Sequence, residues 1–286
     1  MELDQPTYTD IQVEAYLKRI AYTPAAADGR SLVEHVRQRV HIDALGTLTE
    51  LQRHHLAAIP WGNSGLHYSQ HHSISLHPDS LYEKIVERCL DGYCMESTGI
   101  FFIALRSLGY CVYATGGRVD VGFGNNCATA PLPLQEGAIA TCIAPSEMRL
   151  IKDSLIEFTD KSQKVWIYQT RNNPESPWIP NICFSEVEFL PQDFGVMNFS
   201  VSKKPTSWFV QTFVCVRMIM DPTGKEIIGQ CIMSGREVKQ RIGGQTEVLQ
   251  VLQTEEDRVK ALAKYFDMHL RTGEVEGIRG LASQIK

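Results

Sequence analysis

The residue pattern of this chain changes twice along its length, and each change limits the folds that it can adopt. Residues 9 to about 110 read as helices, residues 111 to about 200 read as short apolar strands broken by Gly and Pro, and the last third mixes strands with a helix. Strands and helices do not alternate one by one, which argues against a doubly wound parallel sheet. The pattern therefore predicts an α+β fold.

The helical part carries signals for helix starts and stops. The stretches "SLVE" at 31, "TLTE" at 47 and "SLYE" at 80 each have the spacing of a capping box, with Ser or Thr three residues before Glu. The helix after the second stretch places Leu48, Leu51, His55 and Ala58 on one face and ends before Pro60. The third stretch predicts a further short helix.

The last third predicts a strand, a turn, two more strands and a helix. The stretch "WFVQTFVCVRMIM" at 208 alternates like a strand and meets the turn "DPTGK", after which "EIIGQCIM" and "REVKQRI" continue as strands. The stretch "TEEDRVKALAKYF" at 254 is predicted to be a capped amphipathic helix.

Composition excludes several classes of function. The chain has 28 basic and 33 acidic residues and a formal net charge of −5, so charge gives no case for a nucleic-acid partner or an anionic membrane surface. The start "ELDQPTYTD" is acidic and polar, unlike a secretory signal, and no apolar run reaches the roughly 20 residues of a spanning helix. The eight cysteines include no CxxC pair. We therefore expect a cytoplasmic protein with reduced thiols.

Cys94 is the first candidate for chemistry. It lies in "DGYCMESTGIFFIALRSLGY", residues 91 to 110, where a helix is predicted to begin near Cys94 and to end at Gly109. A thiol in the first turn of a helix lies near free backbone N–H groups and the positive end of the helix dipole, which favours the thiolate. The alternative is a buried structural cysteine, and this stretch alone leaves both interpretations open.

A nucleophilic cysteine needs a base and a group that orients the base. The candidate for the orienting group is Asp120 in "GGRVDVGFGNNCATAPLPL", because a carboxylate inside an apolar strand needs a partner. The glycines after it would bring backbone amides close to a ligand. The alternative is an Asp that caps the turn at a strand end, and the residues alone slightly favour it.

Three motifs together resemble the arylamine N-acetyltransferase family, and most closely its fungal members. They are "GYCMES", "VDVGFG" with "APLPL" behind it, and "IPWGNSGLHY". Family members carry "RGGxCxE", "DVGFG" and "IPFEN" in the same relative places. The likeness extends from about residue 10 to the C-terminus, where "CFSEVEFLPQDFGVMNF" and "QRIGG" also fit.

The resemblance implies a fold, an activity and a site. The fold would be a helical bundle carrying the nucleophile over residues 1–110, a β-barrel over 111–200 and an α/β lid over 201–286. The activity would be acyl transfer from acetyl-CoA or another acyl-CoA to a small aromatic amine or hydrazine, as in xenobiotic metabolism, without a metal. The implied site residues are Cys94 as nucleophile, Asp120 as the group orienting a histidine, and Gly122, Phe123 and Gly124 as substrate-binding residues.

This chain departs from the family pattern at several positions. Leu90 and Asp91 replace the Arg and the first Gly of "RGG", and we expect a carboxylate three residues from the thiol to raise the thiol pKa. Gly62 replaces the acid of "IPFEN". The stretch "GGRV" runs directly into "DVGFG", so the segment that carries the catalytic histidine is missing after Val119, and the predicted barrel is incomplete.

None of the nine histidines lies between residues 78 and 268, where the family base belongs. His67, His71, His72 and His77 are close in sequence, but their spacing is unlike that of a structural zinc site, so a polar loop near the CoA entrance is the preferred interpretation. His269 is expected at the surface of a C-terminal helix. Two alternatives remain: a catalytically inactive homologue that binds CoA or a partner, and a cysteine hydrolase or transglutaminase-like enzyme.

Overall fold

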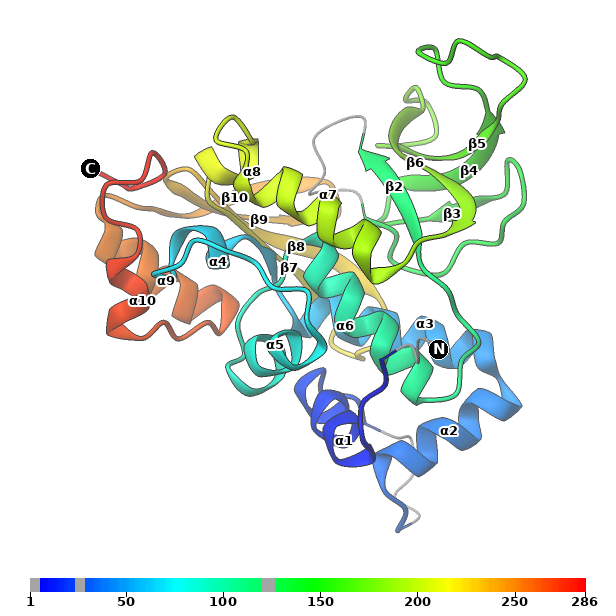
Figure 1. Ribbon diagram of the computed structural model, residues 1–286, viewed down its shortest axis with the longest axis horizontal. Helices are drawn as coiled ribbons and strands as arrows, with labels where there is room; N and C mark the ends of the chain where they lie inside the picture. The colour runs from blue at the N-terminus through cyan, green and yellow to red at the C-terminus, as the bar shows by residue number, and fades with distance from the viewer. Residues whose placement is uncertain (1–5, 24–28, 120–126) are drawn as a thin grey trace.

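A computed structural model describes residues 6–23, 29–119 and 127–286 and has the predicted α+β architecture (Figure 1). Helices form most of the chain up to residue 107, and two sheets and further helices follow. The helices of the first part are α1 (Asp10–Arg19), α2 (Leu32–Ile42), α3 (Ala44–Ala58), α4 (Ser64–His67), α5 (Pro78–Tyr82), the π-helix η1 (Glu83–Glu87) and α6 (Cys94–Ser107).

Two five-stranded antiparallel sheets form the rest of the framework. Sheet A has the order β1-β7-β8-β9-β10, and sheet B has the order β2-β6-β5-β4-β3. The strands are β1 (Trp61–Gly62), β2 (Thr115–Val119), β3 (Ile139–Thr141), β4 (Glu147–Asp153), β5 (Val165–Arg171), β6 (Ile179–Glu188), β7 (Val214–Met220), β8 (Ile227–Ser234), β9 (Glu237–Ile242) and β10 (Gln245–Val251). Neither sheet closes on itself in the described part of the chain, as expected for an incomplete barrel.

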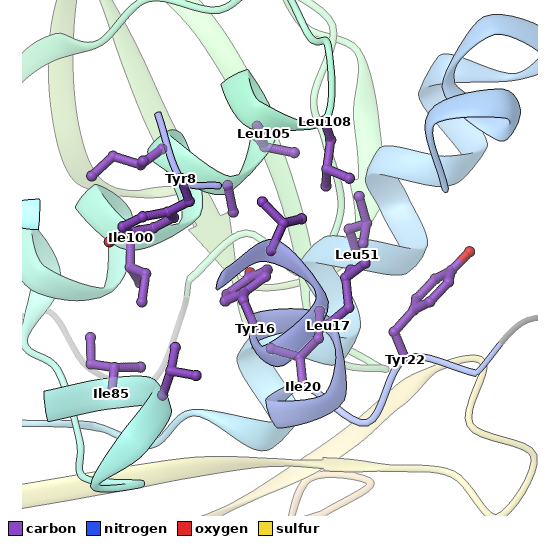
Figure 2. Packing of buried hydrophobic residues seen from close by; sticks show 14 of the residues in the cluster. Tyr8, Tyr16, Leu17, Ile20, Tyr22, Leu51, Ile85, Ile100, Leu105 and Leu108 are labelled. Atoms are coloured by element: carbon purple, nitrogen blue, oxygen red, sulfur yellow. The ribbon is translucent and has the colours of Figure 1, made fainter. Parts of the chain in front are cut away.

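The helical bundle encloses its own apolar core (Figure 2). Tyr16 and Leu17 of α1 and Ile20 at its C-cap are completely buried, and they pack with Leu51 of α3 and Ile100 of α6. Complete burial of one such side chain stabilises the fold by about 1.5–3 kcal/mol. The core therefore fixes α6, the helix that begins with Cys94.

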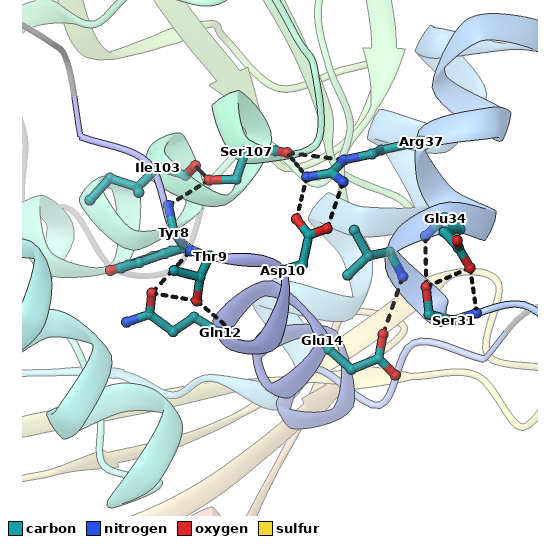
Figure 3. A network of polar contacts seen from close by, with 11 residues as sticks. Tyr8, Thr9, Asp10, Gln12, Glu14, Ser31, Glu34, Arg37, Ile103 and Ser107 are labelled. Atoms are coloured by element: carbon teal, nitrogen blue, oxygen red, sulfur yellow. Dashed lines mark hydrogen bonds and ion pairs between the residues drawn. The ribbon is translucent and has the colours of Figure 1, made fainter.

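Polar contacts at the start of the bundle confirm one predicted cap. Ser31 and Glu34 form the capping box of α2 that "SLVE" predicts (Figure 3). Beside it, the Arg37 guanidinium donates to Asp10 of α1 and to the carbonyl oxygen of Ser107 at the end of α6. These contacts join three helices at the surface of the core.

The other two predicted caps are wrong. Helix α3 begins three residues before Thr47, because the Asp43 side chain accepts from the backbone N–H of Gly46 and caps the helix earlier. Thr47 is buried inside the helix and donates its hydroxyl to the Asp43 carbonyl oxygen. Helix α5 begins at Pro78, a favourable first helical residue, so Ser80 also lies inside a helix.

Two stretches expected to be strand-like are helical. Residues 191–203 form α7 (Pro191–Lys203), and the first part of "WFVQTFVCVRMIM" forms α8 (Trp208–Gln211) before β7 begins. Pro191 at the first position of α7 and the Asp193 carboxylate, which accepts from the Leu190 N–H, favour a helix start there. In Figure 1, α7 passes in front of α6. Helices α7 and α8 bring residues from later in the chain to the start of α6.

The C-terminal helix follows the prediction. Helix α9 (Glu255–Phe266) is capped by Thr254 and Asp257, and its Ala261, Leu262 and Phe266 are buried in a core shared with sheet A. Strand β10 was not predicted, and the short helix α10 (Thr272–Glu276) follows α9. No helix in the described ranges is long and apolar enough to span a membrane. The domain boundaries at 110 and 200 stay a prediction.

Candidate active site

The "IPWGN" and "DGYC" stretches lie side by side although about 30 residues separate them in sequence. The Gly62 N–H donates to the Gly92 carbonyl oxygen at 3.2 Å, and the Gly92 N–H donates to the Pro60 carbonyl oxygen at 3.1 Å. On its other side, Gly62 of β1 pairs with Cys215 of β7. The turn before Cys94 is therefore tied to sheet A.

Cys94 is the first residue of α6, as predicted. A Cβ atom at Gly92 would lie 3.0 Å from Cδ1 of Ile85 and 3.2 Å from Cβ of Glu96, so the tight approach to the helix favours glycine there. The backbone N–H of Tyr93, the N-cap residue, donates to the Glu96 carboxylate at 3.1 Å. These contacts fix where the nucleophile candidate begins its helix.

Burial raises the pKa of the Cys94 thiol to about 11. The backbone N–H groups of Met95 and Cys94 itself lower this pKa, as a helix start should, but they do not offset the burial. The carboxylate that raises this pKa is that of Glu96, rather than that of Asp91 as expected. At neutral pH the group is a thiol, and a reaction through it requires a base.

Aromatic and aliphatic side chains surround the start of α6. The cluster contains Leu66, Ile74 and Tyr93 at its buried centre and Leu76, Cys94, Met95, Val201, Phe209 and Val210 packed against it. The ring of Phe209 lies edge-on to Tyr93 at 6.2 Å, to Trp61 at 6.1 Å and to Trp208 at 5.2 Å between centroids. Phe209 thus lies at the centre of an aromatic group beside Cys94.

Two asparagines hold the α7 and α8 region against this site. The Tyr93 hydroxyl donates to Oδ1 of Asn198 on α7, and Nδ2 of Asn198 donates to the Ile74 carbonyl oxygen at 3.0 Å. Asn63 is completely buried and donates to the carbonyl oxygens of Phe209 and Thr212 at 2.7 and 2.8 Å. Asn63, the last residue of "IPWGN", therefore positions Phe209.

The prediction that His67 lies in a polar loop is wrong. The histidine is completely buried at the end of α4, where Nε2 lies 2.9 Å from the Phe209 carbonyl oxygen and Nδ1 lies 2.7 Å from the Ser283 hydroxyl. Burial lowers its pKa to about 4, against the opposing effect of the Phe209 carbonyl. No group of three or more possible metal ligands occurs in the described ranges.

All nine histidines lie in the described ranges, and no hydrogen bond there joins any of them to Cys94. His55 is buried with Nδ1 2.9 Å from the Tyr16 hydroxyl and Nε2 2.8 Å from the Ser97 hydroxyl. His269 is exposed, as predicted, but lies after α9 rather than in a helix, with Nε2 3.4 Å from the Asp267 carboxylate. The described site therefore has a thiol without a histidine base.

Sequence reasoning and structure overlap only partly at this site. Asp120, Gly122, Phe123 and Gly124 lie outside the described residues. Tyr93, Asn198 and Phe209 belong to the site and were not predicted from the sequence. Only "IPWGN" gave a signal for its surroundings, since its Asn63 contacts the Phe209 carbonyl oxygen.

The fold and the site define an α+β protein in which a cysteine at a helix start faces aromatic side chains. The profile of a family described as N-acetyltransferase matches residues 44–119 and 118–275. The chain is 33% identical, over an alignment of 313 positions, to the N-malonyltransferase FDB2 of Gibberella moniliformis, covering 93% of this chain and 91% of that protein. The chain belongs to the arylamine N-acetyltransferase family.

Further similarities fit this assignment. The chain is 30% identical over 215 positions to the arylamine N-acetyltransferase / N-hydroxyarylamine O-acetyltransferase of Salmonella typhimurium, with 64% of this chain and 72% of that protein covered. The fold matches the arylamine N-acetyltransferase of Mycobacterium marinum, solved in complex with CoA, with a TM-score of 0.71 at 24% identity over 92% of this chain and 97% of that one.

Family membership confirms the predicted class of enzyme. At this level the protein is an acyl-CoA N-acyltransferase of the arylamine N-acetyltransferase type. The inactive-homologue alternative is not favoured, because a relative named as an N-malonyltransferase is similar over nearly the whole chain.

Proposed function

We propose that this protein transfers an acyl group from acyl-CoA to the amino group of an aromatic amine or hydrazine through a thioester on Cys94. The observation that carries the proposal is the position of Cys94, which is the first residue of α6, lies within the "GYCMES" motif and packs beside Phe209. The CoA complex of the Mycobacterium marinum enzyme supports CoA as the carrier of the acyl group.

The proposed reaction has two steps. The Cys94 thiolate attacks the carbonyl carbon of acyl-CoA, and the CoA thiolate leaves with a proton. The acceptor amine then attacks the Cys94 thioester, forms the amide and releases the thiol. Phe209, which is partly exposed and belongs to the same cluster as Cys94, provides an aromatic surface on which an aryl amine can pack.

The donor is not restricted to acetyl-CoA in this proposal. The relative from Gibberella moniliformis and one from Fusarium pseudograminearum, 31% identical over 96% of this chain and 93% of that protein, are both named N-malonyltransferases. Malonyl-CoA is therefore the second donor to test. The cysteines of the described residues are all unpaired, which supports a reducing compartment such as the cytoplasm.

A base is still required, and we infer that a segment carrying it belongs between Val119 and Asp120. The family profile matches in two pieces that meet at residues 118–119, which is the junction where the sequence lacks the histidine segment. The alignment with the Gibberella protein has 313 positions, more than the 286 residues of this chain, so this chain has gaps against it. Strand β2, which ends at this junction, is an edge strand of sheet B.

Mass spectrometry after incubation with acetyl-CoA or malonyl-CoA tests the thioester. An acyl adduct is expected on the peptide that contains Cys94, and Cys94→Ala should abolish it. Cys89→Ala is the matched control, since Cys89 is also partly buried but lies before the turn. An adduct that persists in Cys94→Ala, or that resides on another cysteine, would overturn the assignment.

A further inference from the structure

The turn that leads into Cys94 contains a carboxylate with no access to solvent. Asp91 is completely buried, and its Oδ2 accepts from the backbone N–H of Ser64 at 3.0 Å. Its Oδ1 accepts from the Ser64 hydroxyl and lies 3.9 Å from Nζ of Lys84. The Asp91 side chain therefore joins the start of α4, η1 and the turn before α6.

Asp91 fits only because residue 62 is glycine. A Cβ atom built on Gly62 would lie well within 3.0 Å of Oδ2 of Asp91 and 3.0 Å from the carbonyl oxygen of Val214. The carboxylate thus occupies the space in which a side chain at position 62 would begin. The family pattern has the acid at position 62 and glycine at position 91, and this chain has the reverse.

The Lys84 ammonium lies close to two buried carboxylates, those of Asp91 and Glu96. Nζ of Lys84 lies 2.7 and 2.8 Å from the two carboxylate oxygens of Glu96, which is also buried. Burial raises the Glu96 pKa, and the Lys84 ammonium and the Tyr93 N–H oppose this rise. Lys84 thus lies between Glu96 in the first turn of α6 and Asp91 in the turn that leads into it.

The same contacts reach the aromatic cover of the site. Asp91 holds Ser64, the residue after Asn63, and Asn63 donates to the carbonyl oxygen of Phe209. Loss of the Asp91 carboxylate would leave the buried Ser64 N–H and hydroxyl without their acceptor, which destabilises the fold. Asp91 is thus connected to both Cys94 and Phe209.

We infer that Asp91 and Gly62 form a coupled pair that positions Cys94, with the carboxylate on the turn replacing one on β1. Asp91 acts through Ser64 and Lys84 and does not touch substrate, so it is a positioning residue. The inference rests on Cys94 being the reacting group. Alkylation of the thiol needs no acyl-CoA, so it separates a failure of this inference from a failure of the proposed function.

Four variants test the pair: D91N, D91G, G62E and the exchange G62E/D91G. The measurements are the thermal unfolding midpoint and the rate of Cys94 alkylation by iodoacetamide as a function of pH, followed on the Cys94 peptide. G62E alone should fail to accumulate as folded protein, and D91G alone should lower the midpoint. The exchange should accumulate as folded protein, unlike G62E, and unfold at a higher temperature than D91G, because the acid returns to the same space.

D91N keeps the size of the side chain and removes its charge. Its rate of Cys94 alkylation should rise roughly five-fold across the pH range, because an amide leaves one oxygen instead of two to accept from Ser64 and loosens the turn that holds Cys94. The exchange variant, which restores the carboxylate, should return the profile to that of the unchanged protein. Asp43→Asn is the matched control, since Asp43 also lies against a glycine, Gly46, but caps α3. It should leave the profile unchanged.

Two results would overturn the inference. One is a D91N profile that superimposes on that of the unchanged protein. The other is an exchange variant that fails to fold or unfolds at no higher temperature than D91G, which would mean that positions 62 and 91 act independently.

Discussion

Nε2 of His55 lies 2.8 Å from the hydroxyl of Ser97, one helical turn beyond Cys94 on α6. His55 is the histidine that hydrogen-bonds to the nucleophile helix, yet both of its ring nitrogens are occupied, because Nδ1 bonds to Tyr16. Burial lowers its pKa to about 3, so the ring is neutral at physiological pH. The arrangement is that of a structural link between α1, α3 and α6.

We therefore expect His55→Gln to change stability and not thiol chemistry. The free energy of unfolding should fall by about 1–3 kcal/mol, because the buried Tyr16 or Ser97 hydroxyl loses a well-placed partner. The pH profile of Cys94 alkylation should not move. A profile displaced by a pH unit or more would instead identify His55 as a group that acts on the thiol.

Stability should decrease as the pH falls below about 6.5. His55 and His67 have folded-state pKa values of about 3 and about 4, below the ordinary value of 6.5, so the unfolded chain binds more protons between these values. Their contribution is complete above pH 6.5 and is lost as the pH falls towards 4, at up to about 1.4 kcal/mol per pH unit for each group.

Urea unfolding at pH 7.5, 6, 5 and 4.5 measures this dependence. His55→Phe removes one of the two groups and should reduce the slope of unfolding free energy against pH. His71→Gln is the control, because His71 is exposed and its substitution should leave the slope as it is. An equal slope in His55→Phe and the unchanged protein contradicts the assignment.

The purified chain should acetylate an arylamine far more slowly than an intact relative. A positioned general base contributes about 10²–10⁴-fold, and groups that act as a unit fail together. The thiol pKa of about 11 leaves little thiolate at pH 7.5 without that base. Turnover measured with acetyl-CoA and malonyl-CoA checks this, and rates equal to those of the Salmonella enzyme would require another base, with His269 the first to substitute.

The gene should contain a coding segment that belongs between codons 119 and 120. Two strands and a turn require roughly 20 to 35 residues, and the segment should carry a histidine in an apolar, strand-like run. Sequencing the transcript and the surrounding genomic DNA checks this. A transcript that joins the two codons, with no such stretch nearby, would favour an inactive homologue.

Helix existence was predictable where the periodicity was strong, and helix starts were not. The Ser31 box was correct, because the Ser31 side chain accepts from the Glu34 N–H and α2 begins at the next residue, whereas Asp43 caps α3 before Thr47 can. The α7 region was predicted to be strand-like because it contains Gly and Pro, although Pro191 and Asp193 favour a helix start. The local signals for a helix were therefore present in the sequence, and Gly195 favoured the wrong prediction.

The candidate site was predictable only in part. Cys94 at a helix start followed from a short stretch of sequence, and the thiol pKa did not, because burial depends on Phe209 and other residues more than 100 positions away. The positioning role of Asp91 was also not predictable from the sequence. Its effect depends on whether residue 62 leaves space for it, which a pattern within either stretch does not report.

The contact between His67 and Ser283 joins residues 216 positions apart, and His67 also contacts the Phe209 carbonyl oxygen. At translation rates of about 5–20 residues per second, roughly 10 to 40 seconds separate the synthesis of Cys94 from that of Ser283. During this interval the residues that hold the surroundings of Cys94 in place have not all been synthesised. The thiol is therefore most open to oxidation or alkylation while the protein is still on the ribosome.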